Sequence, residues 1–186
     1  MQIIETGFEG LYIIQPKIFA DSRGYFFESY KLEMFLKAGI PFNPVQDNES
    51  LSSKGVIRGL HYQLEPFAQA KLIRVVTGRI YDVAVDLRKY SETFGLWFGI
   101  ELDSENKTQF FIPKGFAHGF SVLSDTAIIQ YKCDNLYSPE HERGIDLNDP
   151  FLNIDWKIVD IKPVISDKDR KHPKFQDADK NFTKIV

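Results

Sequence analysis

The sequence has few of the features that mark secreted, membrane or nucleic-acid-binding proteins. Cys133 is its only cysteine, so no disulfide can form within the chain and nothing indicates an oxidising compartment. No apolar run approaches the length of a membrane span, and the first residues lack the basic segment of a signal peptide. A net charge of -3 argues against general binding to nucleic acids or anionic membranes. We therefore expect a soluble cytoplasmic protein.

The chain also lacks internal repeats, linkers and low-complexity tracts that would divide it. Its 186 residues, 43% of them hydrophobic and 14% aromatic, suffice for one domain with a proper core but are few for two. We predict a single domain over residues 1–186.

Helical patterns are nearly absent. Only residues 31–38 place apolar side chains on one helical face, at Leu32, Phe35 and Leu36, with Gly39 beyond the end. Elsewhere, short β-rich runs alternate with turn signals. The predicted strands are 11–19, 25–29, 45–51, 56–62, 72–76, 79–87, 96–102, 109–113, 117–123 and 126–133.

Closely spaced strands with almost no helix between them predict an antiparallel sandwich or barrel. Pro16 interrupts the first predicted strand, which is typical of a strand at a sheet edge. The tail from Tyr137 is rich in proline, aspartate and lysine, and we expect it to wrap the barrel.

Two predicted strands carry polar groups that are costly to bury. Arg58 and His61 interrupt the apolar run 56–62, and Lys71 opens the next run. A base, a guanidinium and an ammonium on neighbouring strands indicate a pocket for an anionic, oxygen-rich ligand. Strict alternation would place Arg58 and His61 on opposite faces. They share the pocket only if Gly59 lies in a bulge or bend.

A second histidine, His118, follows a Pro-x-Gly turn and is expected near the mouth of the barrel. Two histidines on adjacent strands could bind a metal. However, Gln63 occupies the position two after His61, and no glutamate at a suitable spacing completes such a site. We predict neither a metal nor a cofactor.

Other polar residues also have ordinary structural explanations. Tyr131 alone could be a packing residue whose hydroxyl reaches the rim. Arg23 and Glu28 could form a surface pair, and residues 167–170 could be a solvated charged segment. The run Gln46-Asp47-Asn48 is harder to explain in this way, because it interrupts an otherwise β-like segment.

Several motifs occur in a characteristic order between about residues 7 and 170. They are Asp21-x-Arg23-Gly24-x-Phe26-x-Glu28, Gln46-Asp47-Asn48-x-Ser50, Arg58-Gly59-Leu60-His61-Tyr62-Gln63, Asp82-Val83-Ala84-Val85-Asp86-Leu87-Arg88, Ile112-Pro113-x-Gly115-Phe116-Ala117-His118-Gly119-Phe120, Tyr131-Lys132-Cys133 and Ser166-x-Lys168-Asp169. In this order they closely resemble the dTDP-4-dehydrorhamnose 3,5-epimerase family. Each motif is weak alone, but the whole series is specific.

The resemblance implies an all-β, cupin-type antiparallel jelly-roll barrel with one short N-terminal helix and a C-terminal wrap. It also implies a homodimer that needs no catalytic metal. The expected substrate is a dTDP-linked 4-keto-6-deoxyglucose, inverted at C3 and C5 in dTDP-L-rhamnose synthesis. No nucleic acid or membrane partner is expected.

The resemblance further implies roles for individual residues. His61 would be the general base and Asp169 the carboxylate that orients it. Tyr131 would be the general acid, and Lys71 would face the keto and enolate oxygen. Residues expected to bind the substrate and its diphosphate are Arg23, Glu28, Gln46, Asp47, Asn48, Arg58, Lys71, His118, Glu142 and Lys168.

The chain departs from the usual family pattern at two places outside this chemistry. Leu147 stands where a tryptophan is common, and Lys157 stands where a proline is common. These departures bear on how the C-terminal wrap packs, and leave the expected base and acid unchanged.

Three alternatives stay open. One is a related enzyme on the same scaffold that inverts only C3 or only C5, or acts on another nucleotide-linked keto sugar. The second is a non-catalytic sugar-binding cupin, which would have no need of His61, Tyr131 and Asp169 together. The third is a metal-dependent cupin enzyme, against which Gln63 counts.

Overall fold

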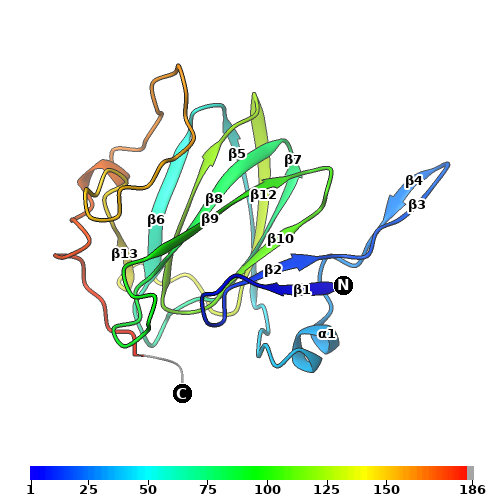
Figure 1. Cartoon of the computed structure of the whole chain (residues 1–186), viewed down its shortest axis with the longest axis horizontal. Helices are drawn as coiled ribbons and strands as arrows, with labels where there is room; N and C mark the ends of the chain where they lie inside the picture. The colour runs from blue at the N-terminus through cyan, green and yellow to red at the C-terminus, as the bar shows by residue number, and fades with distance from the viewer. Residues whose placement is uncertain (184–186) are drawn as a thin grey trace.

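Two antiparallel sheets packed face to face make up most of the computed structural model, which describes residues 1–183 (Figure 1). The six-stranded sheet has the spatial order β1 (Gln2–Glu5), β2 (Tyr12–Gln15), β10 (Gln109–Ile112), β7 (Lys71–Thr77), β12 (Thr126–Cys133) and β5 (Gln46–Ser53). The five-stranded sheet has the order β13 (Glu142–Gly144), β6 (Ile57–Gln63), β11 (Phe116–Val122), β8 (Arg79–Asp86) and β9 (Trp97–Asp103). The predicted antiparallel jelly roll is confirmed.

The main hydrophobic core lies between the two sheets. Ile73 of β7 and Phe110 of β10 meet Val122 of β11 there, and all three are fully buried. Side chains on the inner faces of both sheets interdigitate in this way in β-sandwiches generally. The core therefore joins the sheets along most of their length and leaves one end for a cavity.

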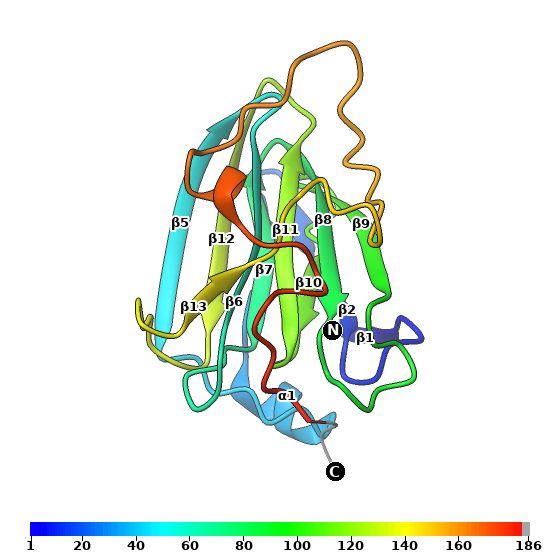
Figure 2. The same cartoon turned by 90° about the vertical axis from the view of Figure 1, so that its left-hand side faces the viewer.

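The C-terminal segment covers the outer face of the five-stranded sheet, as predicted (Figure 2). Trp156, Phe175 and Phe182 of this wrap are buried against residues of β6 and β8. Every residue of β11 is buried as a result, and so is nearly all of β8. The wrap also carries a short 3-10 turn, η1 (Asp169–Lys171), next to β6.

The predicted short helix is α1 (Leu32–Lys37), which lies under one end of the six-stranded sheet. Of its three expected apolar contacts, only Phe35 is buried, where it packs against Phe42 and Phe111. Leu32 and Leu36 are exposed. The helix is therefore anchored through a single aromatic ring.

The prediction that the first strand lies at a sheet edge is wrong. The strand before Pro16 is β2, and it is paired on both sides, with β1 and with β10. The edge position belongs to β1, formed by the first residues of the chain. Pro16 instead ends β2, since it follows the last paired residue.

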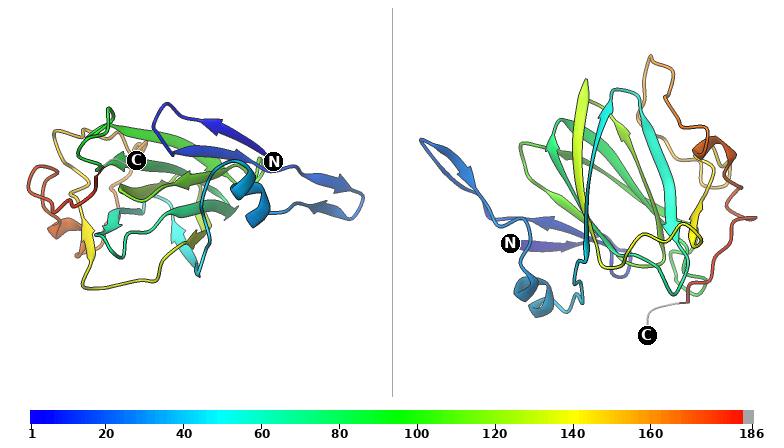
Figure 3. Two further views of the ribbon diagram at one scale, coloured as in Figure 1. Left: turned by 90° about the horizontal axis from the view of Figure 1, so that it is seen from below. Right: turned by 180° about the vertical axis from the view of Figure 1, so that it is seen from behind.

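A two-stranded hairpin, β3 (Phe19–Asp21) and β4 (Gly24–Phe26), projects away from the sandwich (Figure 3). All of its strand residues are exposed, including Phe19 and Phe26. The predicted turn at residues 21–24 is confirmed, and Gly24 adopts a φ of +129°, which favours glycine. Among the described residues, no helix is long and apolar enough to cross a membrane.

Candidate active site

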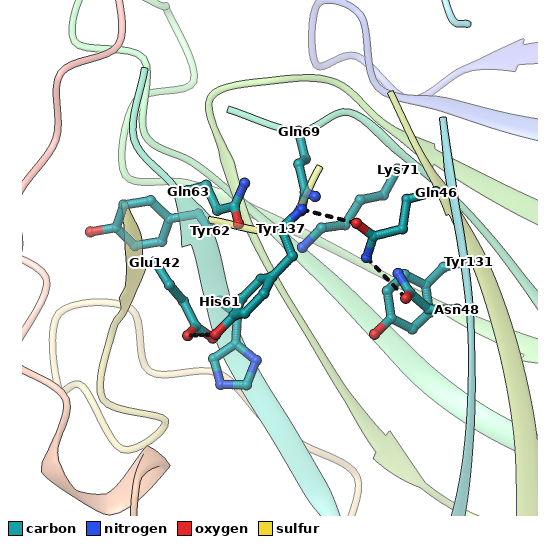
Figure 4. Close-up of a pocket in the computed structure, with 10 residues that line it drawn as sticks. All are labelled: Gln46, Asn48, His61, Tyr62, Gln63, Gln69, Lys71, Tyr131, Tyr137 and Glu142. Atoms are coloured by element: carbon teal, nitrogen blue, oxygen red, sulfur yellow. Dashed lines mark hydrogen bonds between the residues drawn. The ribbon is translucent and has the colours of Figure 1, made fainter. Parts of the chain in front are cut away.

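A cavity of about 310 Å³ opens between the two sheets (Figure 4). Its walls come from β5, β7 and β12 of one sheet and from β6 and β13 of the other. The lining residues are Gln46, Asn48, His61, Tyr62, Gln63, Gln69, Lys71, Tyr131, Tyr137 and Glu142. Nearly all of these side chains end in polar groups, so the cavity suits a ligand rich in oxygen atoms.

The predicted bulge at Gly59 is present and directs His61 into this cavity. His118 of β11 pairs with His61, and Phe120 pairs with Arg58, so two residues of β6 oppose one residue of β11. Gly59 has a φ of +139°, and a Cβ there would lie 2.5 Å from the Cα of Gly119. Only glycine permits this approach of the two strands.

His61 forms a pair with a carboxylate from the C-terminal wrap. Its Nε2 lies 2.7 Å from Oδ1 of Asp169, whose side chain is only 4% exposed. Burial alone would raise the pKa of Asp169, but the hydrogen bond and charge of His61 lower it overall. Because an ionised Asp169 accepts the Nε2 proton, Nδ1 keeps its lone pair for a ligand.

Tyr131 lies across the cavity from His61 (Figure 4). Burial raises the pKa of its phenol, so the hydroxyl keeps its proton at neutral pH. Lys71 lines the cavity from β7. Burial lowers the pKa of Lys71, and the negative charge of Asp82 acts in the opposite direction. The cavity thus combines an imidazole, a phenol and an amine from three strands.

Glu142 and Lys168 meet at the edge of the cavity. Lys168 Nζ and the hydroxyl of Tyr137 both donate to Oε2 of Glu142, at 2.5 and 2.6 Å. Burial of Glu142 would raise its pKa, but these two hydrogen bonds lower it overall. The expected binding residues Glu142 and Lys168 are therefore brought together by the wrap.

Tyr137 and Gln63 are functional candidates that sequence reasoning missed. In the sequence, Tyr137 marks only the start of the tail, and Gln63 belongs to the motif around His61 without a role of its own. The Gln63 side chain donates to the carbonyl of Leu136 at 3.1 Å and accepts from the amide of Ser138 at 2.7 Å. Its amide group therefore holds the loop that places Tyr137 over the cavity. The only sequence signal was an aromatic residue in a polar loop.

Strand alternation separates the expected binding residues of β5. Gln46 and Asn48 line the cavity, and Gln46 Nε2 donates to Asn48 Oδ1 at 3.0 Å. Asp47 points to the opposite face, where it pairs with Lys132 at 2.6 Å. The structure does not bring Asp47 into the site.

Two more expected binding residues lie beside the cavity rather than on its wall. Arg58 Nε donates to the hydroxyl of Ser52 at 3.0 Å, and its charge acts to lower the pKa of Tyr131. His118 is buried, with Nε2 2.9 Å from Oδ1 of Asp82. His118 is therefore engaged away from the His61–Asp169 pair.

Arg23 and Glu28 lie on and after the projecting hairpin, away from the cavity of their own chain (Figure 1). Arg23 pairs with Asp21 at 2.6 Å, and its side chain is 88% exposed. Glu28 pairs with Lys31 at 3.3 Å. Neither lines the cavity within this chain.

The fold and the cavity define a class of protein. An antiparallel jelly roll holds a histidine–aspartate pair, a protonated tyrosine and a lysine around a polar cavity. This arrangement suits an enzyme that moves protons at carbon atoms next to a carbonyl group.

Comparison with known proteins identifies the family. The family model of dTDP-4-dehydrorhamnose 3,5-epimerase matches residues 5–177. The enzyme of that name from Shigella flexneri is 53% identical over 180 residues, which cover 96% of this chain and 98% of that one. The chain belongs to the dTDP-4-dehydrorhamnose 3,5-epimerase family, an isomerase family, and the resemblance seen in the sequence is confirmed.

Solved structures agree. The dTDP-4-dehydrorhamnose 3,5-epimerase of Elizabethkingia anophelis superposes with a TM-score of 0.90 at 51% identity, covering 95% of this chain and 97% of that one. A dTDP-6-deoxy-D-glucose-3,5-epimerase from Legionella pneumophila, in complex with dTDP-4-keto-L-rhamnose, gives a TM-score of 0.90 at 48% identity. This match covers 94% of this chain and 93% of that one.

Proposed function

We propose that the protein inverts C3 and C5 of dTDP-4-dehydro-6-deoxy-D-glucose and yields dTDP-4-dehydro-L-rhamnose. The observation that carries this proposal is the His61–Asp169 pair, held at 2.7 Å with the imidazole facing the cavity and Tyr131 across from it. A protein that only bound sugars would not require a buried carboxylate behind a histidine. Family membership supports the same conclusion.

Proton removal begins each inversion. The hydrogens at C3 and C5 are acidic because both carbons are adjacent to the C4 carbonyl. His61 Nδ1 takes the proton, the C–H electron pair moves into the enolate, and Asp169 stabilises the imidazolium that forms. Lys71 faces the enolate oxygen and lowers the cost of its negative charge.

Reprotonation from the opposite side completes the inversion. Tyr131 donates its proton to the face of the carbon that His61 does not reach, and the electron pair returns from the enolate to form the new C–H bond. The resulting tyrosinate regains a proton from solvent, and the imidazolium releases one. The same sequence then operates at the second carbon. Every step uses side chains of the chain itself, so no cofactor is invoked.

Binding of the nucleotide sugar involves the rest of the cavity and its edge. Gln46 and Asn48 supply amide groups to the sugar. Arg58 and Lys168 supply positive charge for the diphosphate, which arginine binds in bidentate fashion. Glu142 orients Lys168 through their ion pair. The roles of Asp47 and His118 remain predictions that their positions do not favour.

A homodimer explains the hairpin. Arg23 and Glu28 can contact substrate only if the hairpin of one copy reaches the cavity of another, because the hairpin projects away from its own cavity and neither residue lines that cavity. The exposed Phe19, Tyr25 and Phe26 beside them provide apolar surface for such an interface. We also infer a cytoplasmic location, where nucleotide sugars are made.

Solvent exchange tests the function directly. We would incubate the protein with dTDP-4-dehydro-6-deoxy-D-glucose in deuterium oxide and follow label at C3 and C5 by NMR. Label at both carbons supports the double epimerase, label at one supports the single-carbon enzyme, and label at neither supports a binding protein. His61→Ala should lose exchange at both carbons. His141→Ala is the matched control, since His141 does not line the cavity.

A further inference from the structure

A third side chain completes a cluster of metal-binding atoms at the His61–Asp169 pair. His172, at the end of the η1 turn, brings its Nε2 to 3.5 Å from Oδ1 of Asp169. The ligand atoms of His61, Asp169 and His172 all lie within 4.8 Å of one another. Zinc bonds of about 2.0–2.1 Å place tetrahedral ligand atoms about 3.3 Å apart, so small side-chain movements suffice to admit an ion.

The Nε2 atom of His172 is buried and has no hydrogen-bond partner among residues 1–183. Its contact with Oδ1 of Asp169, at 3.5 Å, is longer than an ordinary hydrogen bond. Buried polar atoms seldom lack a partner, and an ion or water is a common explanation when they do. The ring is held in this position by close packing on Gly144, where a Cβ would lie 2.3 Å from Nε2.

The cluster also borders a cavity other than the one that His61 lines. His172 lines a second cavity of about 190 Å³, whose walls come from β6, β13 and the wrap, whereas His61 lines the first. The second cavity is also lined by the carboxylates of Glu142, Asp177 and Asp179, which attract cations, and by two cationic residues, Arg143 and Lys168. Arg143 is paired with Asp179 at 3.0 Å, so their charges offset each other. Lys168 is paired with Glu142, so its charge is offset there.

We propose that His61, Asp169 and His172 form an inhibitory site for a divalent transition metal of the zinc class. Two imidazoles and a carboxylate suit Zn²⁺, Co²⁺ or Ni²⁺ better than Mg²⁺ or Ca²⁺. The inhibition, though not the site, rests on the proposed role of His61 as the base.

Binding of the metal would disable that base through its tautomer. In the free protein, Nε2–H of His61 donates to Asp169 and the lone pair is on Nδ1. A metal takes the Nε2 lone pair, so the single ring proton moves to Nδ1 and Asp169 binds the metal instead. No electron is transferred and no proton is released. Nδ1 then has no lone pair with which to accept a proton from C3 or C5.

Direct metal binding tests the site without reference to catalysis. Chelator-treated full-length protein would be titrated with Co²⁺, whose visible absorption reports ligation by the two imidazoles, and with Zn²⁺ in equilibrium dialysis. His172→Phe keeps a ring on Gly144 and removes the nitrogen, and His172→Ala is a second variant. We expect one metal per wild-type chain and at least about tenfold weaker binding in both variants. His141→Ala should bind as the wild type does.

Activity is then measured with Zn²⁺ and with chelator, each variant relative to its own metal-free rate. We expect the wild type and His141→Ala to lose deuterium exchange as the site fills, and both His172 variants to need at least about tenfold more Zn²⁺ for the same loss. Failure of the wild type to bind metal, or equal binding by the His172 variants, would refute the site. Binding through His172 with an unchanged exchange rate would refute the inhibition alone.

Discussion

Replacing Asp169 with asparagine separates the orientation of the base from the shape of the site. Asparagine has nearly the same size as aspartate and can still accept a hydrogen bond, but it carries no charge. Asp169 is almost completely buried and does not line the substrate cavity. The change should therefore act on His61 and leave substrate binding nearly intact.

The expected magnitude follows from the contact between the two residues. The separation of 2.7 Å between His61 Nε2 and Asp169 Oδ1 is that of a charge-assisted hydrogen bond once the imidazole takes a proton. Hydrogen bonds to charged groups contribute about 1.5–3 kcal/mol. Since about 1.36 kcal/mol corresponds to a factor of ten in rate, kcat should fall about 10- to 150-fold.

Steady-state kinetics and deuterium exchange measure this effect together. Asp169→Asn should lower kcat and the exchange rates at C3 and C5 by the same factor, while KM changes less than about threefold. The unchanged near-UV circular dichroism of the variant would serve as the control for folding. A kcat within twofold of wild type, or a rise in KM alone, would refute the orienting role of Asp169.

Three further predictions concern the acid, the cation and the core. Tyr131→Phe should lower the rate of inversion about 10²- to 10⁴-fold and the rate of deuterium exchange much less, because exchange needs only the base. Equal losses of inversion and exchange in the NMR assay would contradict the role of Tyr131 as the acid. Lys71→Met should abolish activity yet raise the free energy of unfolding, measured in urea at pH 7, by about 1 kcal/mol. The gain is expected because burial lowers the pKa of Lys71, which means that a buried ammonium is costly there. A fall of the same size in the free energy of unfolding would contradict this. Asp86→Asn should lower the free energy of unfolding by about 3–5 kcal/mol, because it leaves the buried Arg88 unpaired at a site where the ions now lie 2.8 Å apart. Burial would raise the pKa of Asp86, but hydrogen bonds from Arg88, Ser91 and Thr93 hold it below 3.8. The difference in free energy of unfolding between wild type and Asp86→Asn should therefore be constant from pH 7 to above pH 3.8 and shrink as the pH falls further. A difference that grows in acid would refute this.

Local residue patterns were enough to predict most of the strands, though not β1 or β13, and one detail of the site. Strict alternation would place Arg58 and His61 on opposite faces of the strand, so a shared pocket required a bulge or bend at Gly59. The bulge is present. Strands β8 and β11 were found through their β-branched and aromatic residues rather than by alternation. They lack alternation because the wrap buries their second face.

The positions of distant residues could not be predicted in this way. Asp169 lies 108 residues from His61, within a charged segment whose composition is typical of a solvated surface. Only the family resemblance indicated a role for it. The first strand was misplaced because Pro16 is equally compatible with a strand edge and with a strand end. Likewise, nothing local shows that the hairpin carrying Arg23 projects away from its own cavity.

If Asp169 orients the base as proposed, catalysis depends on the C-terminal wrap, a segment that lies outside the two sheets. If the wrap lifts from the five-stranded sheet, Asp169 leaves His61 even though both sheets persist. Enzyme activity in increasing urea should then disappear before the β-sheet signal in circular dichroism does. A gap between the two curves would measure how much less stable the attachment of the wrap is than the sandwich beneath it.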